Sequence, residues 1–139
     1  MAIRVFHRDE AETRLPMIAR DARLVVWPGV GAWTANMNYV RMQPGEANVP
    51  HAHPVSEDTI FILAGEGTIE DLTHGTSHPF HAGQVVHVPP GLEHCVKADR
   101  GALIESVGWP CPADVAGLRR AGVLAEAPRD ETGAGAGLE

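Results

Sequence analysis

The chain has few cysteines, few aromatic residues and no long apolar run. Of its 139 residues, two are cysteines and 5% are aromatic. Two thiols do not make a disulfide framework, so we expect Cys95 and Cys111 to be free. No apolar run approaches the roughly 20 residues that a membrane-spanning helix needs, and residues 1–10 lack the hydrophobic core of a secretion signal. These absences predict a cytoplasmic protein with no membrane partner.

Basic residues are also scarce: the chain has 11 lysines and arginines and 18 acidic residues, so its formal net charge is -7. Such a chain has no general electrostatic attraction to nucleic acid or to anionic membranes, so we expect neither as a partner. The length suits one domain with a real hydrophobic core. We assign residues 1–127 to this domain, and the glycine- and alanine-rich residues 128–139 to a flexible C-terminal tail.

Glycine and proline are plentiful, with 15 and 11 residues, and they separate short runs rich in β-branched residues. Such runs are typical of strands joined by turns. We expect strands at residues 23–27, 33–42, 59–63, 68–72, 84–88, 94–98 and 102–107. Residues 112–121 contain helix formers, with a proline and an aspartate near the start, and predict a short helix. The pattern indicates an all-β barrel or sandwich with a short C-terminal helix.

Three histidines form the most informative pattern in the sequence. His51 and His53 are two residues apart in a segment held extended by flanking prolines, so their side chains point to the same side. His94 follows a Pro-Pro-Gly corner that turns the chain back toward the interior of the fold. Three imidazoles and a carboxylate can bind a transition metal and leave coordination positions open. We therefore predict a metal site within the β-structure.

The two histidine-containing stretches resemble the motifs of the cupin family over residues 33–107, which we take as the barrel core. The first stretch matches in its glycines and paired histidines, at Gly45, His51, His53 and Gly65. The second stretch matches in its glycines, proline and single histidine, at Gly83, Pro89, Gly91 and His94. Ala98 stands where the second motif has asparagine, which is not usually a metal ligand. The resemblance implies an antiparallel β-barrel of jelly-roll type with a metal at its centre.

The carboxylate ligand has two candidates in the sequence. Six residues separate Asp58 from Gly65, which places Asp58 where the cupin motif has glutamate. Three residues separate His53 from Glu57, which places Glu57 at the motif spacing counted from His53. Adjacent residues of a strand face opposite sides, so only one of them can point inward. Asp58 has the better register and shares its face with Ile60 and Ile62. A site of three histidines without a carboxylate is the third alternative.

The resemblance also implies one divalent transition metal per chain (Fe, Mn, Ni, Zn or Co) and a small-molecule substrate with adjacent oxygen donors. We expect a metal-dependent enzyme, with dioxygenase-type chemistry placed first. An isomerase, lyase or decarboxylase is the alternative, and a non-catalytic ligand-binding module is a further one. The sequence indicates no catalytic residue beyond the metal ligands and no organic cofactor. Exposed edge strands of a small barrel make a homodimer the expected assembly.

Overall fold

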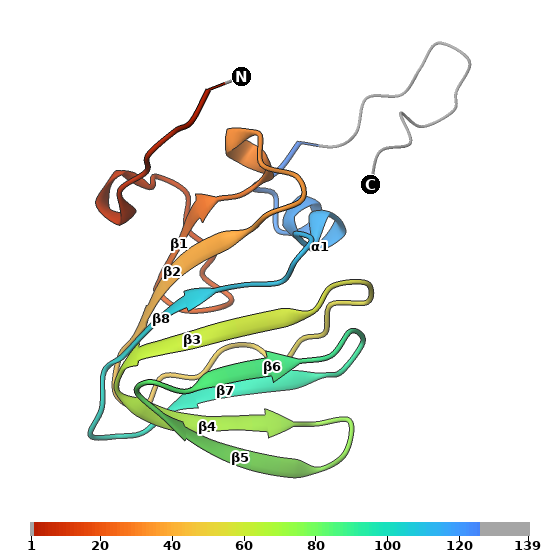
Figure 1. Cartoon of the computed structure of the whole chain (residues 1–139). Coiled ribbons are helices and arrows are strands. Elements are labelled where there is room, and N and C mark those ends of the chain that lie inside the picture. The colour runs from red at the N-terminus through yellow and green to blue at the C-terminus, as the bar shows by residue number, and fades with distance from the viewer. Residues whose placement is uncertain (1, 126–139) are drawn as a thin grey trace.

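The computed structural model describes residues 2–125, which form two antiparallel sheets packed face to face (Figure 1). The five-stranded sheet has the order β1 (Asp21–Val26), β2 (Met37–Met42), β8 (Ile104–Gly108), β3 (Asp58–Ala64) and β6 (Val85–Val88). The three-stranded sheet has the order β5 (Thr76–His81), β4 (Glu66–Asp71) and β7 (His94–Ala98). The helix α1 (Val115–Arg120) lies at one end. The predicted jelly-roll fold and C-terminal helix are confirmed, although the two sheets do not close into a complete barrel. Residues 128–139, the predicted tail, lie outside the described residues.

Alternation along the strands places the core between the sheets. On β3, Ile62 is 2% exposed, whereas Phe61 and Leu63 on the opposite face are 42% and 43% exposed. Strand β6 pairs with β3 so that Val88 lies opposite Asp58, and Val86 lies opposite Ile60. Apolar side chains from both sheets fill the interior, among them Leu24, Met42, Ile62, Ile69, Phe80, Val88 and Ile104.

Gly65 is the single residue between β3 in one sheet and β4 in the other. Its φ is +86°, and a Cβ atom placed there would lie 2.2 Å from the carbonyl oxygen of Leu103. Only glycine meets both conditions without strain. The crossing between the sheets therefore explains why the first motif ends in glycine.

Two strands differ from those expected from the sequence: β2 is shorter than residues 33–42, and β5 is additional. Strand β2 begins at Met37, because the chain first forms the 3-10 helix η2 (Pro28–Val30) and a loop. Strand β5 was not among the expected strands, since its sequence TSHPFH lacks apolar alternation. It forms at the edge of its sheet, paired only with β4, where proline and exposed polar residues are tolerated.

The N-terminal 3-10 helix η1 (Arg8–Glu10) is held near the outer face of the larger sheet by charged groups. The guanidinium groups of Arg8 and Arg23 lie 4.8 and 5.1 Å from the centre of the Tyr39 ring. Arg23 also pairs with Asp21 and with Asp9, each at 2.7 Å. Because Asp21 accepts a hydrogen bond from Arg23 and lies near other arginines, its pKa is lowered, although partial burial opposes the change.

Both cysteines are free, as expected, with Cys95 buried and Cys111 exposed. Within residues 2–125, no helix has the length and apolarity needed to span a bilayer.

Candidate metal centre

Four side chains from three separate segments meet between the sheets. His51 and His53 come from the connection between β2 and β3, Asp58 is the first residue of β3, and His94 is the first residue of β7. One potential ligand atom from each residue lies within 4.8 Å of all the others. Two ligand atoms that each bind the same ion at about 2.0–2.2 Å can lie up to about 4.4 Å apart. A small inward movement therefore suffices for all four groups to share an ion.

Backbone hydrogen bonds bring the two motifs together. The N–H of His51 donates to the carbonyl of His94 at 3.1 Å, and the N–H of His94 donates back at 2.9 Å. The N–H of Gly91, in the corner that precedes β7, donates to the carbonyl of His53 at 2.8 Å. The connection carrying both histidines therefore runs beside β7 as a strand would, and this arrangement fixes His51 and His94 side by side.

The hydrogen bonds of the three imidazoles define which nitrogen is left for a metal. The Nδ1 atoms donate to oxygen acceptors: His51 to Val49 O at 2.7 Å, His94 to Leu92 O at 2.8 Å, and His53 to Asp114 Oδ2 at 3.0 Å. Carbonyl oxygens only accept, so the proton of His51 and of His94 must be on Nδ1. Each neutral ring then presents the lone pair of Nε2, which is the form that binds a metal ion.

Burial of the site leaves polar atoms without partners among the described residues. Asp58 is 3% exposed and His94 is 1% exposed. His53 Nε2, His94 Nε2 and Asp58 Oδ1 are buried and make no hydrogen bond. The Nε2 atoms of His53 and His94 lie 3.7 and 3.5 Å from Asp58 Oδ2, which is ion-pair distance without hydrogen-bond geometry. Buried polar atoms without partners are costly, and a cation bound among them would satisfy all three.

The site environment shifts the imidazole pKa values in opposite directions. Burial is the main cause that lowers the pKa of His51, and the nearby His94 and His53 rings add to it. Burial also acts to lower the pKa of His94, but the Asp58 carboxylate and the Leu92 carbonyl outweigh it, so that pKa is raised.

Asp58 and Glu57, the alternative carboxylates, take opposite positions. Asp58 lies in the cluster, whereas the Glu57 side chain is 61% exposed and pairs with His87 at 3.0 Å. The parity of β3 explains the difference, since Asp58 shares the inward face with Ile62. The group that could hold a metal ion is therefore His51, His53, Asp58 and His94.

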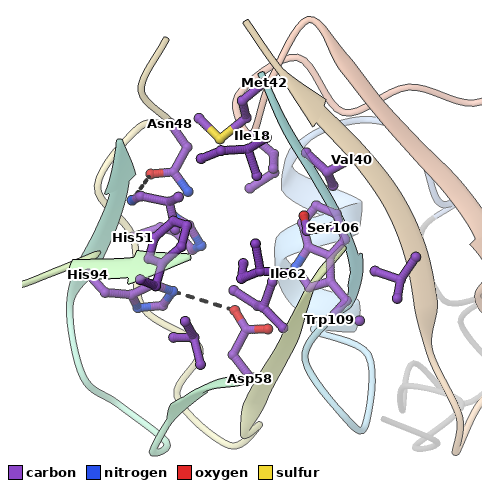
Figure 2. A pocket seen from close by; sticks show the side chains of 17 residues that line it. Ile18, Val40, Met42, Asn48, His51, Asp58, Ile62, His94, Ser106 and Trp109 are labelled. Carbon is purple, nitrogen blue, oxygen red and sulfur yellow. Dashed lines mark hydrogen bonds and ion pairs between the residues drawn. The ribbon is translucent and has the colours of Figure 1, made fainter. Parts of the chain in front are cut away.

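A cavity of about 50 Å³ lies next to this group. Figure 2 shows His51 and His94 on one wall, with Val40 and Ser106 on the opposite wall. A second pocket of about 290 Å³ has His51 and His53 in its wall and lies against α1. Ile18, His51 and Trp109 line both spaces. The metal group is therefore bordered by a small, largely apolar cavity and by a larger pocket.

Sequence reasoning missed Asp114, which supports the site from the C-terminal region. Its Oδ1 atom caps α1 by accepting a hydrogen bond from the N–H of Gly117 at 3.0 Å, and its Oδ2 atom accepts from His53 Nδ1. The hydrogen bond from His53 lowers the pKa of Asp114, against the effect of burial. The helix cap was visible in the sequence, but its second contact depends on the packing of α1 against the barrel.

Comparison with known proteins agrees with this architecture. Residues 38–102 match the model of the cupin domain, and these residues include all four members of the metal group. Over these residues the chain belongs to the cupin superfamily.

Curated relatives match this chain over part of its length. A germin-like protein 3-5 of rice (Oryza sativa subsp. japonica) is 35% identical over 74 residues, which cover 49% of this chain and 33% of that protein. The polyketide synthase CurC of Streptomyces cyaneus is 33% identical over 75 residues, covering 53% of this chain and 47% of CurC. The chain thus spans about a third of the germin-like protein and about half of CurC.

Solved structures resemble this chain in fold. The polyketide cyclase RemF from Streptomyces resistomycificus has a TM-score of 0.65 and 22% identity, and the match covers 80% of each chain. A predicted oxalate decarboxylase from Thermotoga maritima has a TM-score of 0.65 and 19% identity, with 79% of this chain and 100% of that chain covered.

Proposed function

We propose that this protein is a metal-dependent enzyme acting on a small molecule with adjacent oxygen donors. The observation that carries the proposal is the arrangement of the three imidazoles, each with Nδ1 hydrogen-bonded to an oxygen and Nε2 left for a shared ion. Asp58, with one buried oxygen lacking a partner, completes the donor set. Imidazole and carboxylate donors suit Fe, Mn, Co, Ni or Zn.

Four protein ligands leave positions open on an ion that prefers six. A metal bound here supplies a Lewis acid for a carbonyl or enol oxygen and, when redox-active, electrons for dioxygen. The chain itself supplies the surroundings, because Val40, Ile60 and Val96 give the adjacent cavity apolar walls. Such an apolar environment strengthens the attraction between the bound cation and a developing negative charge on the substrate.

Oxygen-dependent chemistry is the first form of this proposal. A cavity of about 50 Å³ with a largely apolar lining holds a diatomic gas or a few small groups, but not a whole organic molecule. The larger pocket beside His51 and His53 has room for an organic substrate. The two spaces thus offer separate places for dioxygen and for a substrate.

A non-oxidative reaction, such as cyclisation or decarboxylation, is the second candidate. It is favoured by the likeness to RemF, described as a polyketide cyclase, and to a predicted oxalate decarboxylase. Lewis-acid catalysis alone would be sufficient for either reaction type.

One experiment separates these candidates. The protein is depleted of metal, reloaded separately with Fe(II), Mn(II), Co(II), Ni(II) or Zn(II), and incubated with α-hydroxy ketones, diketones, enediols and α-hydroxy acids under air and under argon. Turnover with Fe(II) only under air, with matching oxygen uptake, supports the first form. Equal turnover under argon supports the second. A protein that binds metal but converts no compound in either atmosphere contradicts both.

A further inference from the structure

The pocket of about 290 Å³ against α1 combines an apolar wall with polar groups that lack partners. Leu24, Trp27 and Leu118 contribute buried apolar surface to its lining. His51 and His53 form part of the same wall, so a molecule in this pocket lies beside the metal group. Its size and its mixture of apolar walls with a few polar groups are those of a small-molecule site.

Asn38 is an unusual residue for its position. It lies on the inward side of β2, in the same alternating series as Val40 and Met42, and is 3% exposed. Its Oδ1 atom accepts a hydrogen bond from the N–H of Val25 at 3.3 Å, whereas its Nδ2 atom has no partner within residues 2–125. A buried amide that lines a pocket with its donors unused is suited to bind an oxygen atom of a ligand.

Asn36 provides the complementary group two residues earlier. Its Nδ2 atom donates to the carbonyl of Pro110 at 2.9 Å, which identifies the other terminal atom as the oxygen. That Oδ1 atom is buried and has no hydrogen-bond partner in the described part of the chain. Asn36 and Asn38 both line the pocket. Together they offer one acceptor and one donor, which a single hydroxyl group can satisfy because it donates and accepts at once.

Arg120 adds a positive charge at the end of α1. Its side chain lines the pocket and is exposed, and it makes no hydrogen bond or ion pair with any residue from 2 to 125. The nearby carboxylate of Asp114 is already bonded to His53 and Gly117. An arginine with all its donors unused presents the planar fork that binds a carboxylate through two hydrogen bonds.

We propose that this pocket binds a small organic acid with an apolar body and a hydroxyl group next to its carboxylate. Asn36 and Asn38 hold the hydroxyl group, Arg120 holds the carboxylate, and Trp27 and Leu118 contact the apolar body. The assignment of this acid as the substrate rests on the proposed function, whereas its binding does not. Asn38 and Arg120 are then determinants of specificity.

The test uses three related probes that differ by one group. Mandelate carries the phenyl, hydroxyl and carboxylate groups, phenylacetate lacks the hydroxyl, and 1-phenyl-1,2-ethanediol lacks the carboxylate. Binding of each probe is measured by titration calorimetry to the full chain, both metal-free and loaded with Zn(II). We expect saturable mandelate binding in the millimolar range or tighter, and binding of each analogue weaker by about tenfold, the effect of losing about one hydrogen bond's net free energy.

Matched variants assign the contacts. Arg120→Gln should weaken mandelate binding about tenfold and leave diol binding unchanged, whereas Arg119→Gln, with the same change in charge at the neighbouring position, should change neither. Asn38→Asp keeps an acceptor for the Val25 N–H but replaces the donor with a negative oxygen, so mandelate binding should weaken at least as much. Circular dichroism and thermal unfolding confirm that each variant is folded.

Three results would overturn the pocket assignment: no saturable binding of mandelate, equal binding of phenylacetate and mandelate, or equal effects of Arg120→Gln and Arg119→Gln. Metal content and turnover are measured separately. Arg120-dependent binding to a protein that takes up no metal would refute the proposed function and leave the pocket assignment intact. Metal-dependent turnover without Arg120-dependent binding would refute the pocket assignment and leave the proposed function intact.

Discussion

His53 Nδ1 lies 3.0 Å from Asp114 Oδ2, so a residue 61 positions away in the chain orients one imidazole of the metal group. The same aspartate caps α1 through Gly117. The carboxylate thus couples two functions, since it fixes the ring of His53 with Nε2 toward Asp58 and also stabilises the first turn of the helix.

Two substitutions at Asp114 should separate these functions. Asp114→Ser keeps a helix cap but loses the hydrogen bond from His53, so metal affinity should fall about 10–100-fold with little change in stability. Asp114→Ala should show the same loss of affinity and an additional loss of about 1 kcal/mol in the free energy of unfolding. Competition with a chelator of known affinity and urea unfolding measure the two quantities. Unchanged metal affinity in both variants would show that the contact does not support metal binding.

Removing any one ligand should remove bound metal. We expect close to one divalent ion per chain in the parent protein, and much less in His51→Ala, His53→Ala, His94→Ala and Asp58→Asn, because three remaining donors bind a labile ion poorly. Elemental analysis after dialysis gives the stoichiometry. The control variants Glu57→Gln and His87→Ala alter the exposed pair outside the group and should retain metal. Full metal content in Asp58→Asn would instead support the site of three histidines alone.

The Asp21–Arg23 pair predicts a pH-dependent contribution to stability. The pKa of Asp21 is lowered in the folded protein, chiefly by the hydrogen bond from Arg23. Its stabilisation is therefore present above the ordinary pKa of 3.8 and is lost as the pH falls through the lower folded-state value. Asp21→Asn should reduce the free energy of unfolding by about 1 kcal/mol at neutral pH and have no effect in strong acid. A difference that does not depend on pH would contradict this account.

The sheet crossing at Gly65 should tolerate no side chain. Gly65→Ala places a Cβ atom 2.2 Å from Leu103 O, whereas Gly75, also at positive φ (+70°), has open space around it. Gly75→Ala should cost about 1–2 kcal/mol from the backbone conformation alone, and Gly65→Ala about 3 kcal/mol or more. Urea unfolding of both variants tests the difference. Similar losses in the two would show that the chain at Gly65 shifts at little cost.

The motif spacing predicted the part of the site that is local in sequence. His51, His53 and His94 follow from two short stretches, and the parity of β3 favoured Asp58 over Glu57. Asp114 and Asn38 could not be assigned in this way, because their roles depend on how α1 and β2 pack around the pocket. Strand β5 escaped prediction because an exposed edge strand needs no apolar alternation. The predicted homodimer and the assignment of residues 1–127 to one domain stay predictions.

Asp58 belongs to the five-stranded sheet, and His94 belongs to the three-stranded sheet. An ion coordinated by both residues would link the two sheets, in addition to its chemical role. Loading with metal should then slow amide hydrogen exchange in both β3 and β7, because the two sheets could not move apart without breaking bonds to the ion.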